Sequence, residues 1–151
     1  MPKQSAGILL YRNKATQIEV FLVHPGGPFF KNKDDGVWSI PKGEFLEDED
    51  ALAAAKREFL EETGRTIDGD FIPLHPVQLK SGKIIHAWAV EGDVDAALIT
   101  SNLFEMEWPP KSGRLQSFHE VDRAAWFAPD AAKIKLNPAQ VKLVEELEDL
   151  I

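Results

Sequence analysis

The chain has 151 residues, of which 44% are hydrophobic and 28% charged, a composition typical of one soluble globular domain with a substantial core. It contains no cysteine, which excludes disulfides, thiolate metal sites and cysteine nucleophiles and fits a cytoplasmic protein, and no apolar run approaches the roughly 18–20 residues that cross a bilayer. A formal net charge of −8 repels nucleic-acid phosphates, so neither nucleic acid nor a membrane is an expected partner.

The first third of the chain predicts strands and a loop. Residues 5–11 and 18–24 are apolar runs rich in strand-forming residues, joined by a polar segment, and together they predict a β-hairpin. Residues 25–36 contain three glycines and two prolines and are expected to form a loop. A short strand is expected over residues 37–41, followed by a turn over residues 42–44.

Residues 48–63 give the clearest helix pattern in the chain. Asp48 suits the N-cap position, with two more acidic residues in the first turn, and residues 51–55 have high helix propensity. Gly64 is the expected left-handed residue beyond the C-terminus. Three apolar residues share one face at helical spacing, and this face is expected to be buried: Leu52, Ala55 and Phe59.

The remainder of the chain predicts more strands and a final helix. Residues 71–80 and 83–92 are expected to pair around a turn, and residues 102–108 to form a further strand before a loop at 109–114. A last helix is expected up to the C-terminus, capped by Asn137 with Pro138 in its first turn. Strands mixed with two helices predict an α/β or α+β sandwich, with helices covering a mixed sheet and a single domain over residues 1–151.

Three glutamates gather at the C-terminal end of the predicted helix. Glu58, Glu61 and Glu62 are three and four residues apart, so their side chains lie on one side of the helix. Like charges at these spacings cost a few tenths of a kcal/mol per pair, and the helix dipole adds to that cost. A hard divalent cation would neutralise them, and Mg²⁺ is the usual ion where a phosphate shares the coordination sphere. Solvated surface glutamates are the alternative.

The segment from Gly43 to Gly64 resembles the signature of the Nudix hydrolase family. That signature is glycine, five residues, glutamate, seven residues, then Arg-Glu-aliphatic-any-Glu-Glu-any-Gly-aliphatic. All seven specified polar and glycine positions match: Gly43, Glu49, Arg57, Glu58, Glu61, Glu62 and Gly64. The two apolar positions depart from the pattern, because Phe59 and Arg65 stand where an aliphatic residue is usual.

The resemblance implies a Nudix fold, an α/β/α sandwich with a central mixed sheet, and an enzyme that needs Mg²⁺ or Mn²⁺. It also implies that Glu58, Glu61 and Glu62 are metal ligands, joined by the backbone carbonyl near Gly43. Glu58 occupies a position that serves as metal ligand or general base. Arg57 would orient Glu58 through a salt bridge, Glu49 would brace the loop, and Gly43 would permit a tight turn.

Two segments outside the signature extend the resemblance. Residues 38–43 are similar to the Trp-x-x-Pro-Lys-Gly entry of diadenosine tetraphosphate hydrolases and diphosphoinositol phosphatases, so Lys42 is expected to contact a phosphate rather than only solvent. Trp38 is expected in the core rather than stacked on a base. Residues 118–121 are similar to a segment in which dinucleotide- and RNA-cleaving members carry a further glutamate. Glu120 is therefore a candidate fourth carboxylate and metal ligand reaching in from a loop, with a surface or capping role as the alternative.

Several other polar residues are weaker candidates. Glu105 or Glu107 is an alternative to Glu120, and Lys111 and Arg114 are candidate phosphate contacts, although an edge strand with alternating charge explains these positions equally well. The four histidines show no metal-ligand spacing and are expected to be ordinary surface or packing residues: His24, His75, His86 and His119.

Taken with the metal chemistry, the resemblance implies a pyrophosphohydrolase that cleaves a nucleoside diphosphate linked to another group. Dinucleoside polyphosphates or nucleoside triphosphates are the leading substrates, with ADP-ribose and sugar nucleotides as the alternative. A non-catalytic nucleotide-binding regulator is a rival of another class, but such proteins typically lose the glutamates that are all present here. The resemblance places substrate choice in residues 25–36 and 102–117. Whether the protein is a monomer or a homodimer stays open.

Overall fold

The computed structural model describes residues 3–151. Strands β1 (Gln4–Lys14) and β2 (Gln17–Pro25) form the predicted antiparallel hairpin, in which Tyr11 lies opposite Val20. Residues 5–11 of β1 are all buried, which is typical of a central strand covered on both faces. The first hairpin therefore supplies the middle of the sheet.

The main sheet is mixed and follows the order β4-β6-β1-β2-β9. Strand β6 (Ile84–Glu91) runs parallel to β1, whereas β9 (Val121–Phe127) is antiparallel to β2. Two short strands, β4 (Ile72–Pro73) and β5 (Val77–Gln78), pair with β6, and β3 (Lys42–Glu44) pairs with the N-terminal part of β1. The predicted mixed sheet is confirmed.

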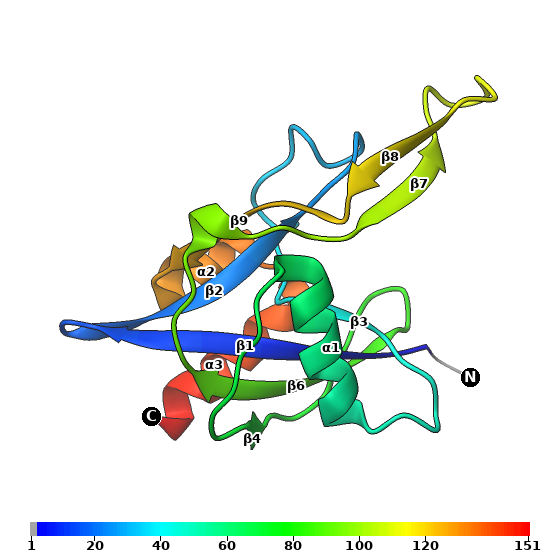
Figure 1. Cartoon of the computed structure of the whole chain (residues 1–151). Helices are drawn as coiled ribbons and strands as arrows, with labels where there is room; N and C mark the ends of the chain where they lie inside the picture. The colour runs from blue at the N-terminus through cyan, green and yellow to red at the C-terminus, as the bar shows by residue number, and fades with distance from the viewer. Residues whose placement is uncertain (1–2) are drawn as a thin grey trace.

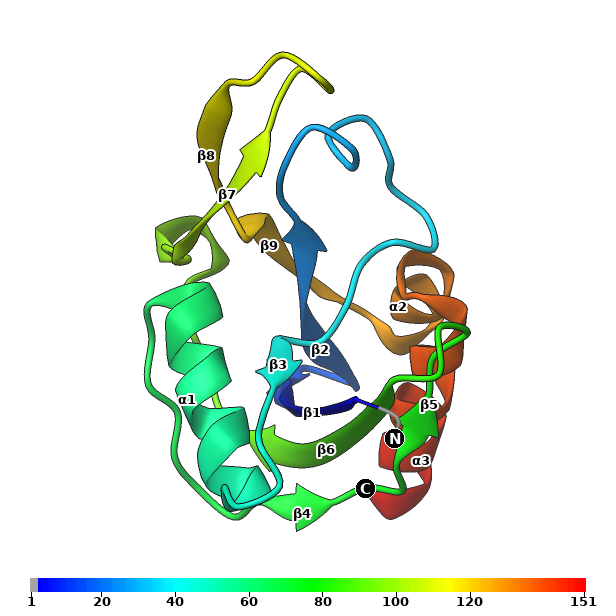
Figure 2. The same ribbon diagram turned by 90° about the vertical axis from the view of Figure 1, so that its right-hand side faces the viewer.

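Helices cover both faces of this sheet (Figures 1 and 2). Helix α1 (Ala51–Thr63) packs on one face, and α2 (Pro129–Lys135) and α3 (Val141–Leu150) lie on the other. The alternation of side chains along β1 creates two cores, because Ile8 points toward α1 while Leu9 points toward α3. This arrangement is the predicted α/β/α sandwich. No helix of residues 3–151 has the length and apolar character needed to cross a bilayer.

The start of α1 differs from the prediction. Asp50, not Asp48, is the N-cap, since its carboxylate accepts a hydrogen bond from the Ala53 amide at 2.9 Å and the helix begins at Ala51. Asp48 lies in the preceding turn. The other end agrees with the prediction: Gly64 has a φ of 73° and its amide donates to the Leu60 carbonyl at 2.8 Å.

Residues 37–41 do not form the expected strand, and the expected turn after them is strand β3. Trp38 and Ser39 make only isolated bridges, to Leu136 and Val23. Strand β3 lies against β1 because position 7 is glycine, where a Cβ would lie 2.7 Å from the Pro41 carbonyl oxygen. The position of the strand in this region therefore depends on the close approach of two backbone segments, which local sequence does not reveal.

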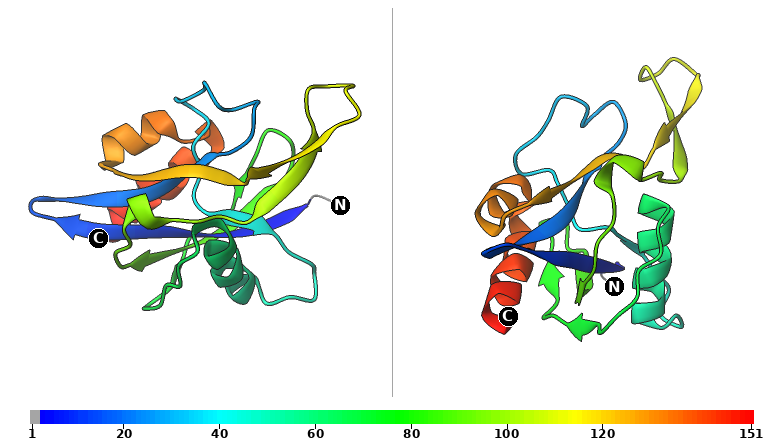
Figure 3. Two further views of the ribbon diagram at one scale, coloured as in Figure 1. Left: turned by 45° about the horizontal axis from the view of Figure 1, so that its top comes forward. Right: turned by 60° about the vertical axis from the view of Figure 1, so that its left-hand side comes forward.

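Other differences lie in the second half. The single strand expected over residues 71–80 is divided into β4 and β5, since Pro76 between them has no N–H for the ladder. Asn137 caps a 3₁₀ turn, η2 (Pro138–Gln140), that leads into α3, whereas α2 and a second 3₁₀ turn, η1 (Ala96–Leu98), were not predicted. Strands β7 (Leu103–Glu107) and β8 (Leu115–His119) form a separate hairpin that extends from one end of the sandwich (Figure 3).

Candidate active site

Arg57 connects three of the motif carboxylates. Its Nη1 donates to Glu58 Oε1 at 2.8 Å and to Glu61 Oε1 at 3.3 Å, and its Nη2 donates to Glu49 Oε2 at 3.1 Å. Glu49 in turn accepts a hydrogen bond from the Leu46 amide at 3.2 Å. The ion pair expected between Arg57 and Glu58 is present, and Glu49 ties the loop before α1 to the same guanidinium.

Gly43 lies directly beneath the Glu58 carboxylate. A Cβ at position 43 would lie 1.9 Å from Glu58 Oε2 and 2.0 Å from its carboxyl carbon, so any side chain would displace this group. Glu58 itself is only 7% exposed. The glycine therefore allows a buried carboxylate to rest against the backbone of β3.

Glu62 faces β3 and a small cavity. Its Oε1 accepts a hydrogen bond from the Lys42 backbone amide at 3.1 Å. A cavity of about 80 Å³ lies beside this contact, and its lining residues are Val23, Pro25, Ser39, Lys42, Glu62, Glu120 and Val121. Two predicted site carboxylates and the predicted phosphate-binding lysine thus border one space, although they come from three different parts of the chain.

Glu120 is held at the junction of β8 and β9 by backbone contacts. The Gly26 amide donates to the Glu120 carbonyl at 2.8 Å, and a Cβ on Gly26 would lie 1.9 Å from the His119 carbonyl oxygen. The Glu120 amide donates to the Asn102 carbonyl at 3.0 Å, and the Asn102 amide donates to the Glu61 carbonyl at 2.8 Å. With its side-chain nitrogen turned toward them, Asn102 also reaches the Glu61 carbonyl at 3.2 Å and Glu120 Oε2 at 3.3 Å.

Gly26 and Asn102 were not predicted as site residues. Their contacts attach the β8–β9 junction to the C-terminal end of α1, which brings Glu120 to the motif glutamates. The Gly-Gly pair that follows β2 was a usable signal for Gly26, because such a pair indicates close backbone approach. Asn102 carried no comparable signal in the sequence.

Burial, together with neighbouring carboxylates, raises the pKa of three of these glutamates: Glu58, Glu62 and Glu120. Burial raises the pKa of Glu58 to about 6, Glu61 adds to the rise and Arg57 opposes it. Burial raises the pKa of Glu62 to about 8, with Glu120 and Glu58 adding to it and Lys42 opposing it. The pKa of Glu120 is also raised, by burial and then by Glu61. Ionising this cluster is therefore costly unless a positive charge joins it.

These residues fit a hard divalent cation, because every side-chain donor is a carboxylate oxygen and the like charges lack full compensation. Among residues 3–151, no three acidic or histidine side chains already converge on one point. Arg57 holds two of the glutamates instead, through ion pairs of 2.8 Å to Glu58 and 3.3 Å to Glu61.

The structure does not bring the other predicted residues to this cluster. Lys111 and Arg114 are exposed and belong to the loop between β7 and β8, and among residues 3–151 neither forms an ion pair with a carboxylate. The β7–β8 hairpin extends away from the sandwich (Figures 1 and 2). Glu107 closes the β7–β8 loop instead, since its carboxylate accepts from the Lys111 amide at 2.8 Å and the Gly113 amide at 3.2 Å. Glu105 is exposed on the same face of the hairpin as Glu107.

His24 is more than an ordinary packing residue. It is fully buried, and its ring connects Asp122 at 2.8 Å with the Lys33 carbonyl at 2.7 Å. It thereby fixes residues 25–36 to β9. Trp38 packs in the core at 4% exposure, in agreement with the prediction, and its indole N–H donates to Asp34.

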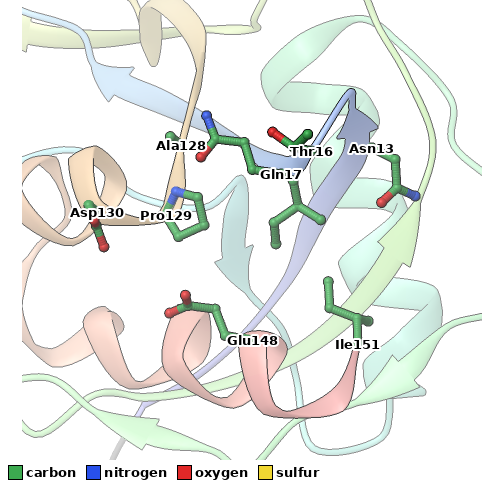
Figure 4. Close-up of a pocket in the computed structure, with 9 residues that line it drawn as sticks. Asn13, Thr16, Gln17, Ala128, Pro129, Asp130, Glu148 and Ile151 are labelled. Carbon is green, nitrogen blue, oxygen red and sulfur yellow. The ribbon is translucent and has the colours of Figure 1, made fainter.

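A second pocket lies away from these carboxylates (Figure 4). It has a volume of about 420 Å³ and lies between the tip of the β1–β2 hairpin, the start of α2 and the end of α3. It is therefore on the face of the sheet opposite α1. Its lining includes Asn13, Gln17 and Glu148 but none of the residues predicted for the active site.

Comparisons with known proteins identify the family and the fold of this chain. A family model described as NUDIX domain matches residues 1–147. A C. elegans Ap4A hydrolase in a binary complex superposes with a TM-score of 0.64 at 22% identity, over 97% of this chain and 96% of that chain. The NUDIX domain of Shewanella oneidensis NrtR, complexed with ADP ribose, superposes with a TM-score of 0.67 at 16% identity, over 99% of this chain and 88% of that chain. Curated protein sequences gave no significant match.

At these identities the superpositions establish the fold, which is that of Nudix domains. Because the family model spans nearly the whole sequence, the chain belongs to the Nudix family, a family of pyrophosphohydrolases, as its motif predicted. Members of this family generally use divalent metal ions and bind small nucleotide substrates.

Proposed function

We propose that this protein is a Mg²⁺- or Mn²⁺-dependent hydrolase that cleaves a pyrophosphate bond in dinucleoside polyphosphates or nucleoside triphosphates. The observation that carries this proposal is that Lys42, Glu62 and Glu120 line one cavity although they come from separate parts of the chain. A surface helix with solvated glutamates would not bury Glu58 against Gly43. The family membership and the complete motif support the same reading.

The groups that would hold the metal are Glu58, Glu61, Glu62, Glu120 and the carbonyl of Gly43. When bound, a divalent ion polarises phosphoryl oxygens and makes a nearby water more acidic. Arg57 keeps Glu58 and Glu61 oriented through its bonds to both. A carboxylate of the cluster accepts the proton of the attacking water. Lys42, which shares the cavity with Glu62 and Glu120, offsets phosphate charge.

ADP-ribose and sugar nucleotides form the second candidate substrate class. The observation that favours it is the structural match to the NUDIX domain of NrtR, whose structure was determined with ADP ribose. The match to an Ap4A hydrolase favours the first class in the same way. Both substrates carry a nucleoside diphosphate, so the proposed site serves either.

The test is a substrate panel with product identification by mass spectrometry. Diadenosine tetraphosphate, ATP, ADP-ribose and UDP-glucose are incubated with the protein in Mg²⁺, alongside a Glu61→Gln variant. Glu61 is half-buried and its side chain bonds only to Arg57 among residues 3–151, so the variant is expected to lose most turnover with little change in melting temperature. Hydrolysis of none of the four, or equal hydrolysis by Glu61→Gln, would overturn the proposal.

A further inference from the structure

Residues 38–41 lead into β3 and the candidate site without forming a regular strand. Figure 2 shows this stretch, in cyan, running from beside α2 to β3. On the side of the sheet, Ser39 and Val23 exchange two backbone hydrogen bonds, of 2.9 and 3.0 Å, which make an isolated bridge. Pro41, which follows, has no N–H to donate. The position of this stretch therefore depends on contacts other than a strand ladder.

Gln140, in the 3₁₀ turn that leads into α3, supplies such contacts from the helical layer opposite α1. Its Oε1 accepts a hydrogen bond from the Ile40 amide at 3.0 Å, and its Nε2 donates to the Ser39 hydroxyl oxygen at 3.0 Å. The Ser39 hydroxyl in turn donates to the Ile40 carbonyl at 2.7 Å. One glutamine side chain thus satisfies, directly or through Ser39, both backbone groups of Ile40.

The position of Gln140 is unusual for a polar residue, because it is only 1% exposed. Three neighbours at spacings of three and four residues are apolar and equally buried: Leu136, Leu143 and Val144. An apolar side chain at position 140 would avoid the free energy of burying an amide. A buried amide with its hydrogen bonds made favours one arrangement of the groups that it joins. Gln140 therefore fixes the stretch before β3 more specifically than apolar packing would.

This stretch continues directly into the candidate site. Ser39 lines the cavity of about 80 Å³ that Lys42 and Glu62 also border. The Lys42 amide donates to Glu62 Oε1 at 3.1 Å. Because Pro41 donates no hydrogen bond, the backbone amides on its two sides hold the turn, one through Gln140 and the other through Glu62.

We propose that Gln140 is a positioning residue for this site. It fixes the stretch before β3 so that the Lys42 side chain and the Gly43 carbonyl stay beside the motif glutamates. Gln140 acts through these groups and touches neither substrate nor metal. This inference rests on the proposed function, in which Lys42 and Gly43 take part, and it adds to the site a residue that lies far from the motif in sequence.

The first measurement needs neither metal nor substrate, and it follows amide hydrogen exchange by NMR in EDTA. Gln140→Met keeps the length of the side chain but removes both of its hydrogen bonds. The ratio of the Lys42 exchange rate to the Leu74 rate reports local loosening, because global opening raises both rates. The Leu74 amide is the reference because it donates to the Ala87 carbonyl in the main sheet. We expect Gln140→Met to raise this ratio about 10-fold, since it leaves a buried donor without a partner.

Two further variants make the measurement specific. Ser39→Ala removes one of the two hydrogen bonds of Gln140, so it should raise the ratio by a smaller factor. In the double variant its effect should be smaller than in the wild type, because the hydroxyl and the amide act together. Val144→Ala is the matched control: it removes apolar packing from the same helical layer and should leave the ratio unchanged.

The second measurement follows the site itself, with Mn²⁺ as the probe. Loss of a group that supports metal ligands weakens metal binding by about 10- to 100-fold, so Gln140→Met should raise the Mn²⁺ dissociation constant by at least about 10-fold. Val144→Ala should retain the wild-type constant, since it has no bond to the stretch before β3 among residues 3–151.

Three results would overturn the inference. The first is an unchanged exchange ratio in both Gln140→Met and Ser39→Ala, the second is an equal rise in Val144→Ala, and the third is wild-type Mn²⁺ affinity in Gln140→Met. If the ratio rises as expected but the wild type neither binds Mn²⁺ nor hydrolyses any substrate of the panel, the hold of Gln140 on Lys42 stands and the proposed function fails.

Discussion

Glu62 shows how one residue couples stability to metal binding. Its pKa in the folded, metal-free protein is about 8, against 4.5 for an ordinary glutamate, mainly because it is buried. The folded state therefore holds this proton over a range in which the unfolded state has released it. Stability from this group is accordingly lost as the pH rises from about 4.5 to about 8.

Replacement of Glu62 by glutamine should remove that loss. The amide oxygen can still accept the hydrogen bond from Lys42, but it carries no charge to bury. In EDTA, the melting temperature of Glu62→Gln is expected to exceed that of the wild type by an amount that grows from pH 5 to pH 8. The melting temperatures are measured by circular dichroism. A difference between the two proteins that stays constant from pH 5 to pH 8 would contradict the burial of Glu62.

Gly43 is predicted to matter for activity more than for stability. In Gly43→Ala the added methyl group displaces the Glu58 carboxylate, which is the flexible end of a side chain, rather than the backbone. Displacement of a catalytic group by about 1 Å costs roughly 100-fold, so kcat/KM should fall by about that factor while the melting temperature changes little. The neighbouring Glu44→Ala, at an exposed position in the same strand, should keep its activity.

The residues of the motif could be predicted because they lie within one continuous segment. The spacing of the glutamates places them on one side of the helix, and Gly64 marks the end of the helix, so the local sequence is enough to predict both features. Gly26 and Asn102 could not be found in this way, since their roles come from contacts with Glu120 and Glu61 that exist only in the folded chain.

At the scale of elements, α1 was predicted correctly in kind and at its C-terminus but not at its start. Four consecutive acidic residues, 47–50, precede the helix, and two of them are aspartates suited to an N-cap. The geometry of the preceding loop makes Asp50 the N-cap. In that loop the Glu49 amide donates a hydrogen bond to the Leu46 carbonyl at 3.0 Å, so the turn ends directly before Asp50. Sequence alone cannot rank such neighbours.

This assignment predicts different effects for the two aspartates. Asp50→Ala should destabilise the protein by about 1 kcal/mol, the usual cost of losing an N-cap, and lower the melting temperature by about 2–4 °C. Asp48→Ala is the matched control and should have almost no effect, since Asp48 makes no side-chain hydrogen bond among residues 3–151. Equal destabilisation by both changes, measured by thermal denaturation, would show that the cap is assigned wrongly.

At the scale of the whole molecule, the site depends on three elements that are remote in sequence. Helix α1 provides three glutamates, β3 provides Gly43 and Lys42, and the β8–β9 junction provides Glu120. The sandwich brings them together because β3 and β9 flank the β1–β2 hairpin on which α1 packs. The mixed sheet and its two helical layers were predictable from the pattern of strands and helices. Of the β7–β8 hairpin, the first strand and the loop were predicted, over residues 102–108 and 109–114, whereas the return strand β8 was not.

The central claim is that the four carboxylates bind a divalent cation, and Mn²⁺ binding followed by the EPR signal of the free aqua ion tests it most directly. The wild type should bind Mn²⁺ more tightly as the pH rises from 6 to 8, since Glu58 and Glu62 release protons over this range. Glu58→Gln and Glu62→Gln should each weaken binding at least about 10-fold, the effect that loss of an outer-shell partner alone can have. Binding that is equal in the wild type and both variants, and flat with pH, would contradict the account.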